Sequence, residues 1–170
     1  MPTFAPLKPH HMMDGSGRPD YVEEPLIKRS TFKDPIEQEY LNFLRRAVAE
    51  VGNGNTMNSK LDAYGKKHLV TYTGAYPYDA MPKLKHGQSC IVNQDKRGNP
   101  GIHWFAVCND HGRLYGYDSF GRKMDKYIKR NVISDTEDRE QLSKEENCGA
   151  RCLAFLHCYE KYGIDRAMRI

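Results

Sequence analysis

The chain has 170 residues, of which 39% are hydrophobic and 28% are charged, and its formal net charge is +4. These values fit one soluble globular domain with a core of its own. They exclude a membrane-spanning protein, because no apolar run approaches the required length, and residues 1–6 contain no signal-peptide core. The mild charge is compatible with an acidic partner but does not require one.

The five cysteines are an odd number in a chain that shows no export signal. We therefore expect free thiols in a reducing compartment and no disulfide framework. The cysteines lack Cys-x-x-Cys spacing, and no histidine joins them at the spacing of a zinc site, so we expect no metal.

The N-terminal segment differs in composition from the rest. Residues 1–33 contain five of the nine prolines and a Gly-Ser-Gly run. This predicts an extended or disordered proline-rich arm, followed by a folded domain over residues 34–170.

Two helices are predicted next. Asp34 is a candidate cap, Pro35 suits the first helical position, and Gly52 ends the pattern. The apolar stripe of this helix comprises Ile36, Tyr40, Leu44, Ala47, Val48 and Val51. A weaker helix is predicted for residues 58–66.

Four segments then have the composition of short strands: 69–73, 89–92, 101–107 and 113–118. The last two are joined by the turn signal Asn-Asp-His-Gly at residues 109–112, which predicts a hairpin. A helix is predicted over residues 122–133 from the spacing of Met124, Tyr127, Ile128 and Val132. The order of helices, strands and helices indicates an α+β domain.

The last predicted helix runs from Cys148 to Tyr162 and is nearly apolar all round, so it should cross the core. Asn147 is a candidate cap, which puts Cys148 in the first turn, where the positive end of the helix dipole favours a thiolate. Gly149 leaves room beside it for another chain to approach. The alternative is that Cys148 is one more buried cysteine.

A partner for this thiol is predicted from the hairpin register. If the turn is centred between Asp110 and His111, His103 lies directly across from Asp118, within reach of a hydrogen bond that would fix the imidazole tautomer. A register shifted by one residue would place the two on opposite faces. The alternatives are a half-buried strand histidine and an aspartate that caps a turn.

Gln141 lies seven residues before Cys148 in a polar loop. Its amide could donate to a developing oxyanion, as could the backbone N–H of Cys148. Taken alone, it is more simply a surface glutamine.

Together these motifs resemble a known family. Gly-Ile-His-Trp at 101–104, Tyr-Asp-Ser-Phe-Gly at 117–121, and Gln141 seven residues before Cys-Gly resemble the adenain-like adenovirus maturation proteases. Ubiquitin-like-protein proteases look similar in outline. The resemblance covers about residues 56–160, and the short chain looks most like the capsid-maturation proteases of virophages.

The resemblance implies a single papain-like or adenain-like α+β domain, with a small mixed or antiparallel sheet packed against a central nucleophile-bearing helix. It also implies that Cys148 is the nucleophile, His103 the base, Asp118 the residue that orients His103, and Gln141 an oxyanion donor. Trp104 would bind substrate beside the catalytic centre, although its strand parity points it away from His103 and a core aromatic is the alternative.

The implied activity is that of a late viral cysteine endopeptidase, which cleaves capsid precursors beside small residues such as Gly during virion maturation. It would act as a monomer, without a membrane, in the host cytoplasm or virus factory, and be packaged in the virion. No cofactor is expected. The disulfide-linked peptide activator of the family does not transfer, because residues 119–147 contain no cysteine.

The family also uses DNA as a cofactor. The residues that would bind DNA weakly are the basic residues Arg122, Lys123, Lys126, Lys129 and Arg130. Two other functions stay open at this point: an isopeptidase that removes ubiquitin or SUMO, and a non-catalytic interaction module.

Overall fold

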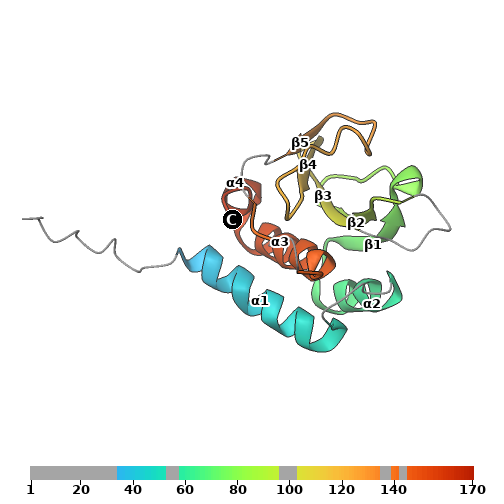
Figure 1. Ribbon diagram of the computed structural model, residues 1–170. Coiled ribbons are helices and arrows are strands. Elements are labelled where there is room, and N and C mark those ends of the chain that lie inside the picture. Colours follow the sequence, from blue (N-terminus) through green and yellow to red (C-terminus); the bar gives the residue numbers. More distant parts are fainter. Residues whose placement is uncertain (1–33, 53–57, 96–102, 135–138, 142–144) are drawn as a thin grey trace, which may run out of the picture. The chain divides into compact units, whose positions relative to one another are not determined.

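The computed structural model of the protein describes residues 34–52, 58–95, 103–134, 139–141 and 145–170. The arm predicted for residues 1–33 lies outside the described residues, as do Gly101 and Ile102. The described residues form an α+β fold with one mixed sheet of five strands, which confirms the predicted fold class (Figure 1).

Helix α1 (Pro35–Val51) forms as predicted. The Asp34 carboxylate accepts a hydrogen bond from the backbone N–H of Ile36 at 3.1 Å, and Gly52 ends the helix with a φ of 97°. Helix α2 (Asn58–His68) also matches its prediction, with two more residues at its end. Its lysines at the C-terminus suit the negative end of the helix dipole.

The sheet has the strand order β1-β2-β3-β4-β5, with bounds β1 (Tyr72–Pro77), β2 (Ser89–Asn93), β3 (Trp104–Asp110), β4 (Arg113–Tyr117) and β5 (Val132–Ser134). The central pairs are antiparallel, whereas β1 and β5 run parallel to their neighbours at the two edges. Both faces of β2 and β3 are buried, because the residues of these strands contribute to two separate core clusters.

The first strand prediction, residues 69–73, is misplaced. Strand β1 begins only at Tyr72 and continues to Pro77. Leu69 is buried in the core while Val70 is 96% exposed, so the two precede the sheet and do not extend it. Pro77 is tolerated because β1 is an edge strand.

Helix α3 (Cys148–Tyr162) runs through the core, as its all-round apolar sequence predicts. It packs on β3 on one side and on α1 on the other, so that α3 lies between the sheet and α1 (Figure 1). A short helix α4 (Ile164–Ala167), which was not predicted, follows Gly163. Among the described residues, none of the helices has both the length and the apolar character needed to cross a membrane.

The helix predicted over residues 122–133 is wrong. Residues 122–131 are not helical. They contain a turn over residues 124–128, closed by hydrogen bonds from the backbone N–H groups of Tyr127 and Ile128 to the carbonyl of Met124, and residues 132–134 form β5. Met124 and Ile128 are buried, as their spacing predicted, but they cover the face of the sheet that lies away from α3. The free edge of β4 offers parallel pairing to Val132, and this tertiary contact outweighs the helical pattern.

Candidate active site

Cys148 is the first residue of α3, and its side chain stands out among the five free cysteines. It is 8% exposed, whereas the other four are 0% exposed. Its backbone N–H belongs to the first turn of the helix, where amide groups have no acceptor within the helix. Asn147 occupies the cap position, but the predicted capping bond is not made, because its side chain accepts from Nε of Arg151 at 2.9 Å.

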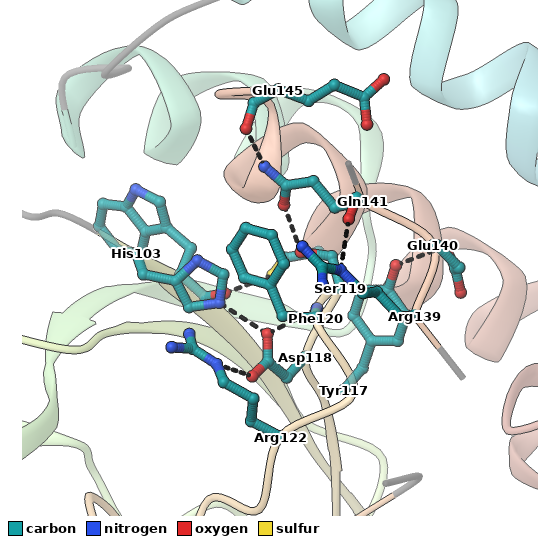
Figure 2. Close-up of polar contacts among 12 residues, drawn as sticks. His103, Tyr117, Asp118, Ser119, Phe120, Arg122, Arg139, Glu140, Gln141 and Glu145 are labelled. Atoms are coloured by element: carbon teal, nitrogen blue, oxygen red, sulfur yellow. Dashed lines mark hydrogen bonds and ion pairs between the residues drawn. The ribbon is translucent and has the colours of Figure 1, made fainter. Parts of the chain in front are cut away.

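His103 and Asp118 are brought together at the same end of the hairpin. Nε2 of His103 lies 2.6 Å from Oδ1 of Asp118, and the two side chains are only 5% and 0% exposed (Figure 2). His103 comes immediately before β3, and Asp118 immediately after β4. With Nε2 engaged, Nδ1 is the ring nitrogen left to interact with Cys148.

The register that predicted this pair is wrong by two residues. Asp110 pairs with Arg113 and Ala106 with Tyr117, so the turn is centred between His111 and Gly112. Both turn residues have positive φ, 50° and 82°, as a two-residue type I′ hairpin requires. A shift of two residues keeps the side-chain parity, so His103 and Asp118 become diagonal neighbours on one face.

Further contacts hold the Asp118 carboxylate in place. Oδ1 also accepts from the backbone N–H of Phe120 at 3.0 Å, and Oδ2 accepts from Nε of Arg122 at 2.9 Å. The Phe120 ring lies over the His103 ring, with 4.9 Å between centroids. The imidazole is therefore fixed by both a hydrogen bond and a ring contact.

The electrostatics favour a charged pair at this site. Burial lowers the pKa of His103, but hydrogen bonds to Asp118 and Cys148, and the negative charges of both, outweigh it and raise the pKa overall. Burial raises the pKa of Asp118, but the bonds and charge of His103, the Phe120 amide and Arg122 bring it below its ordinary value. An imidazolium beside a carboxylate is thus stabilised.

The other cysteines lie in the opposite environment. Burial raises the pKa of Cys90 and Cys158 to about 12. Burial also raises the pKa of Cys108 and Cys152. At neutral pH these four thiols stay protonated, which makes them poor nucleophiles.

A change at Asp118 should move the alkaline limit of activity. Asp118→Asn removes the negative charge that raises the His103 pKa, so the imidazolium should lose its proton at a lower pH. We expect the alkaline limb of the kcat/KM profile for peptide cleavage to move to lower pH, and kcat/KM at neutral pH to fall roughly 10- to 100-fold. The control is Asp110→Asn, which alters an exposed His–Asp pair at the hairpin turn. An alkaline limb that does not move in Asp118→Asn contradicts this role.

Gln141 is not the surface glutamine that its local sequence suggests. It is 2% exposed, and its Oε1 accepts a hydrogen bond from Oγ of Ser119 at 2.6 Å. Its Nε2 donates to the backbone carbonyl of Glu145 (Figure 2). An amide nitrogen carries two hydrogens, so this bond leaves one for an oxyanion.

Two other residues that were expected to face the substrate, Trp104 and Gly149, pack in the core. Trp104 is 3% exposed and belongs to the core cluster on the α3 side of the sheet, which agrees with the core alternative; its contact with substrate stays a prediction. Gly149 does admit a close approach, but by α2. A Cβ at Gly149 would lie 2.5 Å from Cδ1 of Leu61. Helix α2 therefore fills the space that was predicted to admit another chain.

Sequence reasoning missed the supporting residues of the site. Ser119 and Arg122, which bond Gln141 and Asp118, lie in the motif Tyr-Asp-Ser-Phe-Gly-Arg directly beside Asp118. Adjacency to Asp118 was the only signal available for them. Arg151, which joins Glu140 and Glu145 to α3, carried no signal that distinguished it from a surface arginine.

One group of metal-ligand residues occurs in the part of the chain that the structure describes. His86, Asp110 and His111 have ligand atoms within 4.8 Å of one another. They lie at the β3–β4 turn, at the opposite end of β3 from His103. Nδ1 of His86 already accepts from the His111 backbone, and the Asp110 carboxylate bonds the His111 ring. This group takes no part in the candidate active site.

Comparison with known proteins supports the resemblance seen in the motifs. The chain is 30% identical to the protease of bovine adenovirus 7, in a match that covers 44% of this chain and 48% of that protein. The protease of bovine adenovirus 4 is 27% identical with the same coverage. A candidate thiol protease of Acanthamoeba polyphaga mimivirus is 43% identical over 25% of this chain and 15% of that protein.

These are weak homologies. No protein-family profile matches the chain, and it spans about half the length of the adenovirus proteases and less of the mimivirus protein. The similarity supports an adenain-like protease, while the closer likeness to virophage proteases stays a prediction.

Proposed function

We propose that this chain is a cysteine endopeptidase in which Cys148 is the nucleophile and His103 the general base. The single observation that carries the proposal is the buried 2.6 Å hydrogen bond between His103 and Asp118, which orients an imidazole whose pKa Cys148 also raises. Acyl transfer through a covalent intermediate requires a nucleophile, a base within reach of it and a carboxylate that orients the base. The similarity to viral proteases agrees with this chemistry.

The first half-reaction forms a thioester. His103 takes the proton from the Cys148 thiol through Nδ1, while Asp118 holds Nε2 and stabilises the imidazolium. The thiolate attacks the peptide carbonyl, whose oxygen becomes negatively charged. The Cys148 backbone N–H and the Gln141 amide would donate to this oxygen, at about 3 kcal/mol per donor. His103 then protonates the leaving amine.

The second half-reaction releases the acid product. Water enters after the amine has left, and His103 accepts its proton as the water attacks the thioester carbonyl. The same two donors stabilise the second oxyanion. Collapse of this intermediate expels the thiolate and restores the resting pair.

The proposed substrates are viral structural precursors, cut beside small residues such as Gly during virion maturation. The proposal for this substrate class rests on the family resemblance and on the viral origin of the similar proteases. Because Leu61 fills the space beside Gly149, this glycine does not support a preference for Gly in the substrate, which rests on the resemblance alone.

The test is to incubate the protein with the structural proteins of its virus and to sequence the N-termini of the products. The proposal predicts discrete cuts next to small residues, absent from a parallel incubation with the Cys148→Ala variant. Products that also arise with Cys148→Ala, or no products at all, contradict it. Labelling of Cys148 by a ubiquitin-tail electrophile, without cuts in the viral proteins, would identify an isopeptidase instead.

The proposed setting is the infected cell and the virion, with a monomer that acts without a metal or small cofactor. Weak DNA binding stays a prediction, and the arrangement of the basic residues supports it less than their sequence did. Residues 122–131 are not helical, Arg122 bonds Asp118, and Arg130 donates to the carbonyls of Met81 and Pro82, so the five basic residues do not form one helical face.

A further inference from the structure

Two neighbouring residues after β4 contact the two halves of the candidate active site. Asp118 bonds the imidazole of His103, and Ser119, the next residue, bonds the amide of Gln141. Ser119 is 0% exposed, so its hydroxyl has no access to solvent. The proposed base and the proposed oxyanion donor are therefore both held by one dipeptide at the end of a central strand (Figure 2).

The contacts of Gln141 define the orientation of its amide. The Glu145 carbonyl can only accept, so the side of the amide that faces it must be the NH₂ group. The other side is then the oxygen, which accepts from Oγ of Ser119 at 2.6 Å. A flipped amide would bring two carbonyl oxygens together, and Ser119 would no longer satisfy a buried acceptor.

The backbone of Ser119 holds the same loop. Its carbonyl accepts from the N–H of Glu140 at 3.1 Å and from the N–H of Gln141 at 3.0 Å. The backbone bonds thus fix the position of the Gln141 main chain, and the Ser119 hydroxyl fixes the position of the Gln141 side-chain amide. The second function belongs to the side chain alone and can be removed without touching the backbone bonds.

The far side of the loop is tied to the nucleophile helix. Nη2 of Arg151 lies 3.1 Å from Oε2 of Glu145, the residue whose carbonyl receives the Gln141 amide. Arg151 stands one turn after Cys148 on α3. The acceptor that orients Gln141 is therefore fixed relative to the sulfur.

We propose that Ser119 is a positioning residue, which places the Gln141 amide so that its second N–H can reach the oxyanion formed at Cys148. This inference rests on the proposed function. An oxyanion donor acts only when it lies about 2.7–3.1 Å from the charged oxygen, so a loosened amide loses much of its effect on the transition state. It should lose little of its effect on substrate binding.

The test is a double-mutant cycle between Ser119 and Gln141, followed by cleavage of a peptide that ends in Gly-Gly-aminomethylcoumarin. We expect Gln141→Ala to lower kcat about 100-fold and Ser119→Ala about 10-fold, with KM changed less than about twofold. The double variant should fall about 100-fold, not about 1000-fold, because Ser119 acts only through Gln141. Ser119→Cys, which keeps a weaker donor of similar size, should lie between wild type and Ser119→Ala.

Ser89 supplies the matched control. It is also 0% exposed, and its hydroxyl bonds Oγ1 of Thr71 at 2.9 Å, away from the site. Ser89→Ala should lower the melting temperature about as much as Ser119→Ala does, with kcat unchanged. Additive losses in the cycle, or equal kcat values for Ser119→Ala and Ser89→Ala, overturn the inference. Wild-type protein that leaves the peptide and the viral structural proteins intact contradicts the proposed function itself.

Discussion

Cys148→Ala should lower kcat/KM for peptide cleavage by about 10⁵-fold, because removal of the nucleophile in a triad removes nearly all of the catalysis that the triad provides. The fold should survive. The change deletes one sulfur atom at the first turn of α3, and the thiol is the most exposed of the five. Thermal unfolding and peptide hydrolysis, measured on the same preparation, check both parts.

Cys158→Ala is the matched control for this variant. Cys158 lies on the same helix, is 0% exposed in the core, and its sulfur lies 3.9 Å from the carbonyl oxygen of Ile36. Its loss should cost about 1 kcal/mol of stability and leave kcat/KM within about twofold of wild type. Substantial residual activity in Cys148→Ala, or an equal loss in Cys158→Ala, contradicts the assignment of the nucleophile.

His103→Ala should lower kcat/KM by about 10³- to 10⁵-fold, because the variant lacks both the base that ionises the thiol and the acid that protonates the leaving amine. Asp118 would then be a buried carboxylate without its imidazole partner, although Arg122 still bonds it. We expect some loss of stability at neutral pH as well. Kinetics with the peptide substrate and a melting curve separate the two effects.

His157→Ala controls for the loss of a histidine–carboxylate pair. Nε2 of His157 lies 2.7 Å from Oε1 of Glu39, nearly the same distance as in the His103 pair, and the ring stacks on Phe43 at the interface of α1 and α3. No cysteine is its hydrogen-bond partner among the described contacts. His157→Ala should therefore reduce stability and keep kcat/KM within a few-fold of wild type. If the two histidine variants lose activity equally, His103 is not the base.

The helices that flank the site could be predicted because local sequence determines them. Asp34, Pro35 and Gly52 mark the ends of α1, and the apolar run after Cys148 identifies a helix buried on all sides. The placement of Cys148 at the start of α3 follows from these signals. The partner of Asn147 could not be predicted, because Arg151 competes for its side chain from within the helix.

The meeting of His103 with Asp118 was predicted from the wrong register. The turn sequence Asn-Asp-His-Gly allows a two-residue loop at either Asp110–His111 or His111–Gly112, and the positive φ that Gly112 adopts easily favours the second. The error of two residues preserved the face of each side chain. An error of one would have separated the pair.

The features that the sequence did not predict correctly depend on tertiary contacts. The spacing of Met124 and Ile128 predicted that both residues are buried, but it did not predict the path of the chain. That path depends on the packing of Met124 against Gly116, where an added Cβ would lie 2.0 Å from Cε of Met124. Gln141 is buried through contacts with Ser119 and Glu145, and neither contact has a local sequence signal. Only the resemblance to a protease family distinguished Gln141 from an ordinary loop residue.

The central claim is that His103 and Asp118 make Cys148 the reactive thiol of this protein. The direct measurement is the rate at which iodoacetamide modifies each of the five cysteines in the folded protein at pH 6.5, resolved by peptide mass spectrometry. The account predicts modification of Cys148 alone, with a rate that drops sharply in His103→Ala, because burial holds the other four thiols protonated. Comparable rates at all five cysteines, or a Cys148 rate that His103→Ala leaves unchanged, would contradict it.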